Sequence, residues 1–212
     1  LGMSNSQFMN ASGWPDPDHY SSARDLATLA KRLIKDFPEY YSYFSEEEFT
    51  YNNINQQNRN PLLYRDIGAD GIKTGHTEDG GYGLMASGTR NSRRVILVVN
   101  GLEDNKARAQ ESARLLEWGL KGFDNFELFK KGDEVSAATV AVGTESTVPL
   151  VIDEDVVVTI PINVKNDLKV EAIYDGPIVA PVKEGQQIGT LKITIPRMDS
   201  FEYPLYAGKS VG

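Results

Sequence analysis

The spacing of the apolar residues changes once along this chain, close to Gly122, and this change constrains the fold most. Before it, residues 26–37 place Leu, Ala, Ile and Phe three and four positions apart, as in an amphipathic helix. After it, Val, Ile and Thr gather in short runs between Gly, Pro, Asp and Asn, as in a small β-sandwich or barrel. The sequence therefore predicts two domains, residues 1–121 with helices and strands and residues 122–212 with strands alone.

Two helices are predicted in the first domain. Ser22, followed three residues later by Asp25, has the form of a capping box, and the helix that it opens should end before Pro38. Asn105 is expected to cap a second helix that ends near Gly122.

The segment between these helices is predicted to contain a loop and a β-hairpin. Residues 52–60 are polar and rich in Asn, which favours a loop. Residues 82–89 and 94–100 read as two strands that flank the short polar connection 90–93, which suits an antiparallel hairpin.

The composition excludes several classes of function. The chain has 22 Lys and Arg against 30 Asp and Glu, a net charge of −8, and this disfavours nucleic acid and anionic lipid as partners. Its longest apolar run, residues 95–99, is far shorter than the roughly 20 residues that a membrane helix needs. The absence of Cys removes disulfides, thiol catalysis and Cys-based zinc sites.

The most informative motif is Lys73-Thr74-Gly75, within the run from Asp70 to Thr77 and just before the predicted hairpin. On an edge strand it would present an ammonium, a hydroxyl and an unobstructed backbone along one wall of a cleft. The amide of His76 could then point at a developing oxyanion.

Several ordered segments around this motif resemble one family, the D-alanyl-D-alanine carboxypeptidases, which are low-molecular-mass penicillin-binding proteins. The resemblance covers essentially the whole chain and rests on residues 1–3, 20–26, 49–52, 58–60, 70–77, 81–82, 116–119 and 167–169. It implies an α+β fold, with an incomplete β-lactamase/transpeptidase-like domain (an antiparallel sheet with helices) followed by a small all-β sandwich domain. It also implies a serine-type periplasmic enzyme that removes the terminal D-Ala from peptidoglycan stem peptides, is acylated by β-lactams and needs no diffusible cofactor.

The resemblance assigns roles to six residues. Lys73 would anchor the terminal carboxylate of the substrate and take part in proton transfer, and Thr74 would hydrogen-bond that carboxylate. Gly75 would keep the strand open, and the amide of His76 would supply an oxyanion donor. Arg59 and Arg108 match positions on the carboxylate side of the cleft.

The sequence departs from the family at the nucleophile. No Ser-x-x-Lys and no Ser-x-Asn occurs, and Tyr51-Asn52-Asn53, which fits Tyr-x-Asn, lies on a predicted strand shortly before Lys73 and is interpreted as coincidence. We therefore expect a C-terminal portion of such an enzyme, inactive alone and without the amphipathic anchor helix of the family. Residues 94–100 would lack a neighbouring strand, so we expect a homo-oligomer or a bound N-terminal fragment at that edge.

Other interpretations remain open or are set aside. Residues 180–191 resemble the turns of biotinyl or lipoyl domains, with Lys169 as the nearest candidate for modification, and the β-rich half could instead be an interaction module. No metal site is expected, because His19 and His76 are the only histidines. Ser87 lacks the Gly-x-Ser-x-Gly frame of a hydrolase nucleophile.

Overall fold

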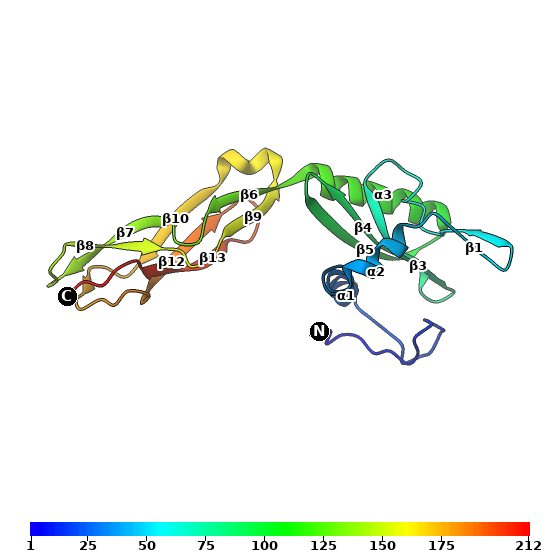
Figure 1. Cartoon of the computed structure of the whole chain (residues 1–212), viewed down its shortest axis with the longest axis horizontal. Helices are drawn as coiled ribbons and strands as arrows, with labels where there is room; N and C mark the ends of the chain where they lie inside the picture. The colour runs from blue at the N-terminus through cyan, green and yellow to red at the C-terminus, as the bar shows by residue number, and fades with distance from the viewer. The chain divides into compact units, whose positions relative to one another are not determined.

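The structure is a computed structural model that describes all 212 residues, and it contains two compact units, residues 1–122 and 123–212 (Figure 1). The elements of the first unit are α1 (Ala23–Asp36), α2 (Pro38–Tyr41), the 3-10 helix η1 (Ser42–Ser45), β1 (Glu48–Tyr51), β2 (Ile54–Gln57), β3 (Ala69–Thr77), β4 (Gly81–Arg90), β5 (Arg93–Leu102) and α3 (Asn105–Gly122).

A three-stranded antiparallel sheet, in the order β3-β4-β5, organises the first unit. Its two faces are covered by different helices (Figure 1). Leu116 of α3 packs with Leu84 in one buried cluster, and Ala30 of α1 packs with Ile72 in another. The sheet is therefore sandwiched between helices, and the outer edge of β3 is free of any other strand.

The predicted caps are right for α1 and wrong for α3. The hydroxyl of Ser22 accepts a hydrogen bond from the Asp25 amide at 3.1 Å. At α3, the Asp104 carboxylate accepts from the Ala107 amide at 2.6 Å, whereas Asn105 is the first helical residue. Asp104, one position earlier, caps the helix because its negative charge is also stabilised by the positive N-terminal end of the helix dipole.

The predicted loop at residues 52–60 contains a strand. β1 and β2 form an antiparallel hairpin in which Tyr51 pairs with Ile54. Asn52 and Asn53 form its two-residue turn, with φ of 52° and 60°. Asn tolerates this left-handed conformation better than most residues, so an Asn-rich run can close a tight turn as well as form a loop.

The predicted hairpin is formed by β4 and β5, which are each longer than the sequence indicated. Asn91 and Ser92, with φ of 50° and 61°, make the turn. Within this chain β5 is bonded to β4 alone, so its other edge faces no strand.

The second unit is a small β domain with one continuous core. Its elements are β6 (Phe123–Phe129), β7 (Glu134–Ala141), β8 (Thr147–Val151), β9 (Val156–Pro161), the 3-10 helix η2 (Ile162–Asp167), β10 (Lys169–Tyr174), β11 (Ile178–Val179), β12 (Gln187–Thr194) and β13 (Phe201–Ala207). A six-stranded sheet, β10-β12-β13-β8-β7-β11, and the pair β6-β9 share a single apolar cluster that includes Leu150, Ile160 and Leu191. The sequence predicted that this domain contains strands alone, and the structure differs only in the short 3-10 helix η2.

Lys169 does not lie where a carrier domain presents its modified lysine. It is the first residue of β10, pairs with Thr194 and follows η2 directly, rather than standing at a hairpin tip. The preceding Leu168 packs against the core and holds this segment to the sheet. No helix in either unit is long and apolar enough to cross a bilayer.

Candidate active site

The Lys73-Thr74-Gly75-His76 motif lies on β3, at the free edge of the sheet. Lys73 and Gly75 pair with Met85 and Gly83 of β4. Lys73, Gly75 and His76 are exposed, whereas Thr74 is buried, with 8% of its surface accessible. The motif is thus on a strand and in contact with a pocket, as the sequence interpretation required.

All six predicted site residues line one pocket of about 640 Å³. Arg59 comes from the loop after β2, and Arg108 comes from α3. Three cationic side chains therefore meet here, and no carboxylate is among the lining residues. The full lining is Ser12, Gly13, Arg59, Lys73, Thr74, Gly75, His76, Thr77, Tyr82, Asn105 and Arg108.

This charge arrangement is suited to an anion. The chain as a whole carries a net charge of −8, so the local excess of positive charge is set by the fold rather than by composition. Clefts lined by one sign of charge concentrate ligands of the opposite sign. The Nζ of Lys73 contacts only the Thr74 carbonyl, at 2.5 Å, and has no carboxylate partner in the structure.

Arg108 is the most constrained of the three cations. One terminal nitrogen donates to the Gly75 carbonyl at 3.3 Å, and the other donates to the Asn105 side chain at 2.6 Å. Its guanidinium carbon lies 5.6 Å from the centre of the Tyr82 ring. Burial lowers the pKa of Arg108, while Tyr82 acts in the opposite direction, and the buried Nε has no hydrogen-bond partner.

Beside His76, Tyr82 contributes an aromatic ring to the pocket and Gly75 leaves the strand without a side chain. The rings of His76 and Tyr82 lie 4.0 Å apart, centre to centre. A Cβ added at Gly75 would meet no atom within 4 Å, so the backbone there faces open space. A ligand can therefore approach the strand closely at this position.

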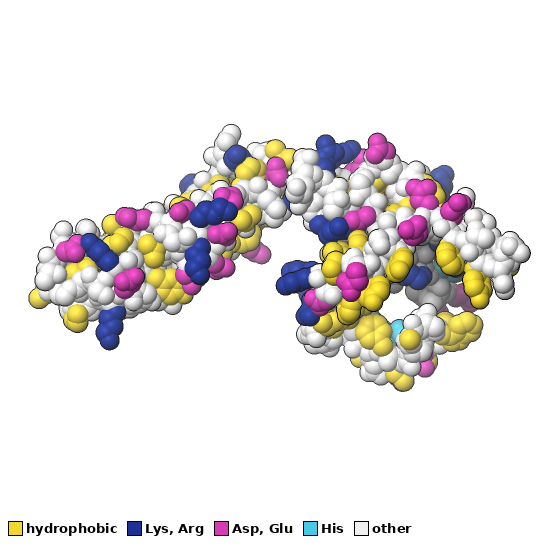
Figure 2. Space-filling view, in the orientation of Figure 1, with side chains coloured by type: hydrophobic (Ala, Val, Ile, Leu, Met, Phe, Trp, Pro, Cys, Tyr) yellow, Lys and Arg dark blue, Asp and Glu magenta, His cyan; other side chains and the backbone are white.

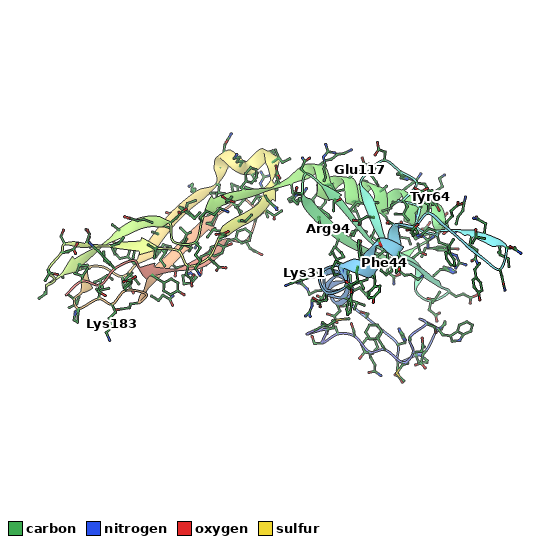
Figure 3. The ribbon with its side chains drawn as sticks, viewed as in Figure 1. Lys31, Phe44, Tyr64, Arg94, Glu117 and Lys183 are labelled. Carbon is green, nitrogen blue, oxygen red and sulfur yellow. The ribbon has the colours of Figure 1, made fainter.

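Two sets of contacts hold the start of β3. Asp70 accepts from the Tyr41 hydroxyl at 2.9 Å and from Arg94 at 2.8 Å, and Arg94 also donates to Ser87 at 2.6 Å. Figure 3 shows Arg94 on its strand in this part of the sheet. Burial, reinforced by the charge of Asp70 and opposed by the hydrogen bond with Ser87, raises the pKa of Tyr41 to about 12.

The second set of contacts joins β3 to the loop that carries Arg59. The Asn60 amide donates to the Gly71 carbonyl at 2.8 Å, and its oxygen accepts from the Leu62 amide at 3.1 Å. Asn60 is almost fully buried. The contact lies two residues before Lys73 and one after Arg59, so it holds the backbone of the Arg59 loop against the backbone of β3.

Sequence reasoning missed the supporting residues rather than the motif. Tyr82 and Asn60 were part of the segments that carry the resemblance, but nothing in their spacing indicated contact with Arg108 or Gly71. Asn105 was assigned to the helix cap, and the structure instead places it against Arg108. Ser12 and Gly13 gave no signal at all before the structure placed them beside the pocket.

The chain matches two families described as "D-alanyl-D-alanine carboxypeptidase", over residues 1–104, and "Penicillin-binding protein 5, C-terminal domain", over residues 123–212. It is 39% identical to the D-alanyl-D-alanine carboxypeptidase DacA of Haemophilus influenzae, over 100% of this chain and 55% of that protein. The chain thus spans about half the length of the curated relatives that it matches.

Solved structures agree with this likeness. Penicillin binding protein 5 from Haemophilus influenzae has a TM-score of 0.82 and 38% identity, covering 100% of this chain and 62% of that one. Penicillin-Binding Protein D2 from Listeria monocytogenes, in its ampicillin-bound form, has a TM-score of 0.50 and 29% identity, covering 55% of this chain and 50% of that one.

Proposed function

This chain belongs to the D-alanyl-D-alanine carboxypeptidase family, and we propose that it forms the carboxylate-binding side of the active site of a serine-type D-Ala-D-Ala carboxypeptidase. The substrate would be a peptidoglycan stem peptide that ends in D-Ala-D-Ala. We propose that β-lactams occupy the same pocket. Two findings support this: one matching family is described as a penicillin-binding protein, and one similar structure contains bound ampicillin.

One observation carries this proposal: three cations and no carboxylate line a pocket along the free edge of β3. A peptide that ends in a carboxylate needs a positive site for its end and an exposed strand edge for its backbone. Hydrogen bonds in which one partner is charged are about twice as strong as neutral ones. The pocket offers both features side by side.

The residues then have distinct tasks. Lys73 and the two arginines hold the terminal carboxylate, with the Thr74 hydroxyl as a further donor. Gly75 leaves room for the peptide backbone, and the amide of His76 donates to the carbonyl oxygen as it becomes negative during attack. A preorganised donor of this kind is worth about 10²- to 10³-fold in rate.

The covalent step needs a serine with its activating lysine, and residues 1–212 contain no Ser-x-x-Lys. In the proposed reaction a serine hydroxyl from outside these residues attacks the carbonyl between the two D-Ala residues. The C–N bond breaks, the proton passes to the leaving amine of D-Ala, and water then hydrolyses the ester and restores the serine.

Release of D-Ala tests the proposal directly. The protein as encoded, with any segments that flank residues 1–212 left in place, should release D-Ala from an acylated D-Ala-D-Ala peptide and be labelled covalently by fluorescent penicillin. Residues 1–212 alone should not be labelled. Labelling of this 212-residue chain would contradict the claim that the nucleophile lies elsewhere, and no release by the encoded protein would contradict the function.

We also propose a partner at the free edge of β5 and a periplasmic location. An unpaired apolar strand edge tends to recruit another strand, so this edge would be covered by a second copy or by another part of the enzyme. Sedimentation and hydrogen exchange of the 212-residue chain check this proposal: a monodisperse monomer in which the outer edge of β5 is already covered and protected from exchange would contradict it. Fractionation of cells tests the location.

A further inference from the structure

Arg108 depends on its two terminal nitrogens for the hydrogen bonds that hold it, because its Nε is buried and has no partner. The bond to the Gly75 carbonyl is long, at 3.3 Å, whereas the bond to the Asn105 side-chain oxygen is 2.6 Å. Hydrogen bonds from N–H groups to oxygen are normally about 2.7–3.2 Å long. Asn105 therefore makes the closer of the two contacts that orient this guanidinium.

The start of α3 places the two side chains together. Asn105 is the first residue of the helix, and Arg108 follows three positions later. Residues three apart lie on the same face of a helix, so their side chains can meet. Both residues line the pocket along β3. Because a guanidinium has donors only, the oxygen of the amide is the atom that turns toward Arg108.

The groups that contact Arg108 are all neutral: the Gly75 carbonyl, the Asn105 amide and the Tyr82 ring. Elsewhere in this unit, acidic and basic side chains lie close together on the surface (Figure 2). Three other arginines are each held by a carboxylate: Arg32 by Asp36, Arg94 by Asp70 and Arg114 by Glu111. A carboxylate beside Arg108 would offset much of the positive charge that the pocket presents to an anion.

The carboxylate nearest to Asn105 in the chain is engaged elsewhere. Asp104 accepts from the Ala107 amide at 2.6 Å and is not among the lining residues. Asn and Asp have nearly the same size and shape, and both can accept a hydrogen bond from Arg. The amide at position 105 thus decides that Arg108 is held by an acceptor without a charge.

We propose that Asn105 is a positioning residue, which orients Arg108 toward the terminal carboxylate of the substrate without neutralising its charge. This inference rests on the proposed function, which assigns Arg108 to that carboxylate. Asn105 acts through Arg108, and the proposal needs no contact between Asn105 and the substrate. The consequence is that an acidic residue at position 105 is worse for the reaction than a residue with no hydrogen-bonding group.

The test compares kcat/KM for release of D-Ala from an acylated D-Ala-D-Ala peptide by variants of the encoded protein. Asn105→Asp should lower kcat/KM by more than about tenfold, because the new carboxylate pairs with Arg108. Asn105→Ala should lower it by about 3- to 10-fold, mainly through KM, since the carboxylate is bound in the ground state as well. Asn105→Gln keeps the amide and should restore most of the loss.

Gln110→Glu is the matched control. It makes the same exchange of amide for carboxylate on α3, at an exposed position outside the pocket, and should change kcat/KM by less than about twofold. In an Arg108→Gln protein, Asn105→Ala should cause no further loss, because the residue that it orients is gone. Losses that multiply in the double variant, or an Asn105→Asp protein as active as the unmodified one, would overturn the inference.

Nitrogen NMR of the arginine side chains separates this inference from the proposed function. The two Nη signals of Arg108, identified by their loss in Arg108→Gln, should be resolved in the encoded protein, because a held guanidinium rotates slowly. They should merge in Asn105→Ala. Merged signals in the unmodified protein, or resolved signals in Asn105→Ala, would overturn the positioning role. If the unmodified protein releases no D-Ala, the proposed function fails, and the spectra still decide whether Asn105 holds Arg108.

Discussion

Replacing Lys73 with Gln is the most direct test of the candidate site, because it removes one charge and keeps a side chain of similar length. Two unit charges 4 Å apart at an effective dielectric constant of 20 attract by about 4 kcal/mol. Lys73 is exposed, and a hydrogen bond to a charged group contributes about 1.5–3 kcal/mol net. At 1.4 kcal/mol per factor of ten, kcat/KM should fall about 10- to 150-fold.

The assay is release of D-Ala from the acylated dipeptide by the encoded protein, measured at two salt concentrations. The unmodified protein should lose activity as salt rises, because the attraction to the carboxylate is screened, and the Lys73→Gln protein should lose less. Lys31→Gln is the control, since Lys31 is an exposed residue of α1 outside the pocket (Figure 3). Equal kcat/KM in the Lys73→Gln and unmodified proteins would refute the argument that this ammonium binds substrate.

Three further predictions concern the framework of the site. Because the pKa of Tyr41 is raised to about 12 in the folded protein from 10.0, the stability it contributes is complete below pH 10 and is lost as the pH rises through 12. Urea unfolding should show a loss of about 2 kcal/mol over that window, absent from Tyr41→Phe, and identical pH profiles would contradict this. Leu116→Ala empties a fully buried position between α3 and the sheet and should lower the free energy of unfolding by about 2–5 kcal/mol; a cost below 1 kcal/mol in chemical denaturation would show that the site collapses. The Cβ that Gly75→Val introduces meets no atom within 4 Å, so thermal unfolding should change little, whereas D-Ala release should fall at least about tenfold because the side chain occupies the path of the peptide; unchanged release would mean that the substrate does not lie along β3.

Local sequence patterns predicted the structure correctly where the residues involved strongly favour one type of local structure. The Leu and Ile spacing before Pro38 predicted α1, and the Ser22 hydroxyl caps this helix as expected. The second half of the predicted capping box does not form, because the Asp25 carboxylate accepts from Asn5 and Ser6 instead. The same reasoning was wrong where two residues competed for one position, as Asp104 and Asn105 did at α3. It was also wrong where Asn closed a tight turn instead of forming a loop, as at residues 52–53.

The sequence by itself determined the motif, the family and the change from a mixed domain to a β domain, because these depend on the order and spacing of neighbouring residues. Only the tertiary structure decided which side chains meet at the pocket. Arg59, Lys73 and Arg108 lie far apart in the chain, and their convergence depends on long-range contacts such as Asn60 with Gly71. Charge focused at a site is a sum over groups brought together in space, and a linear pattern carries no information about those distances.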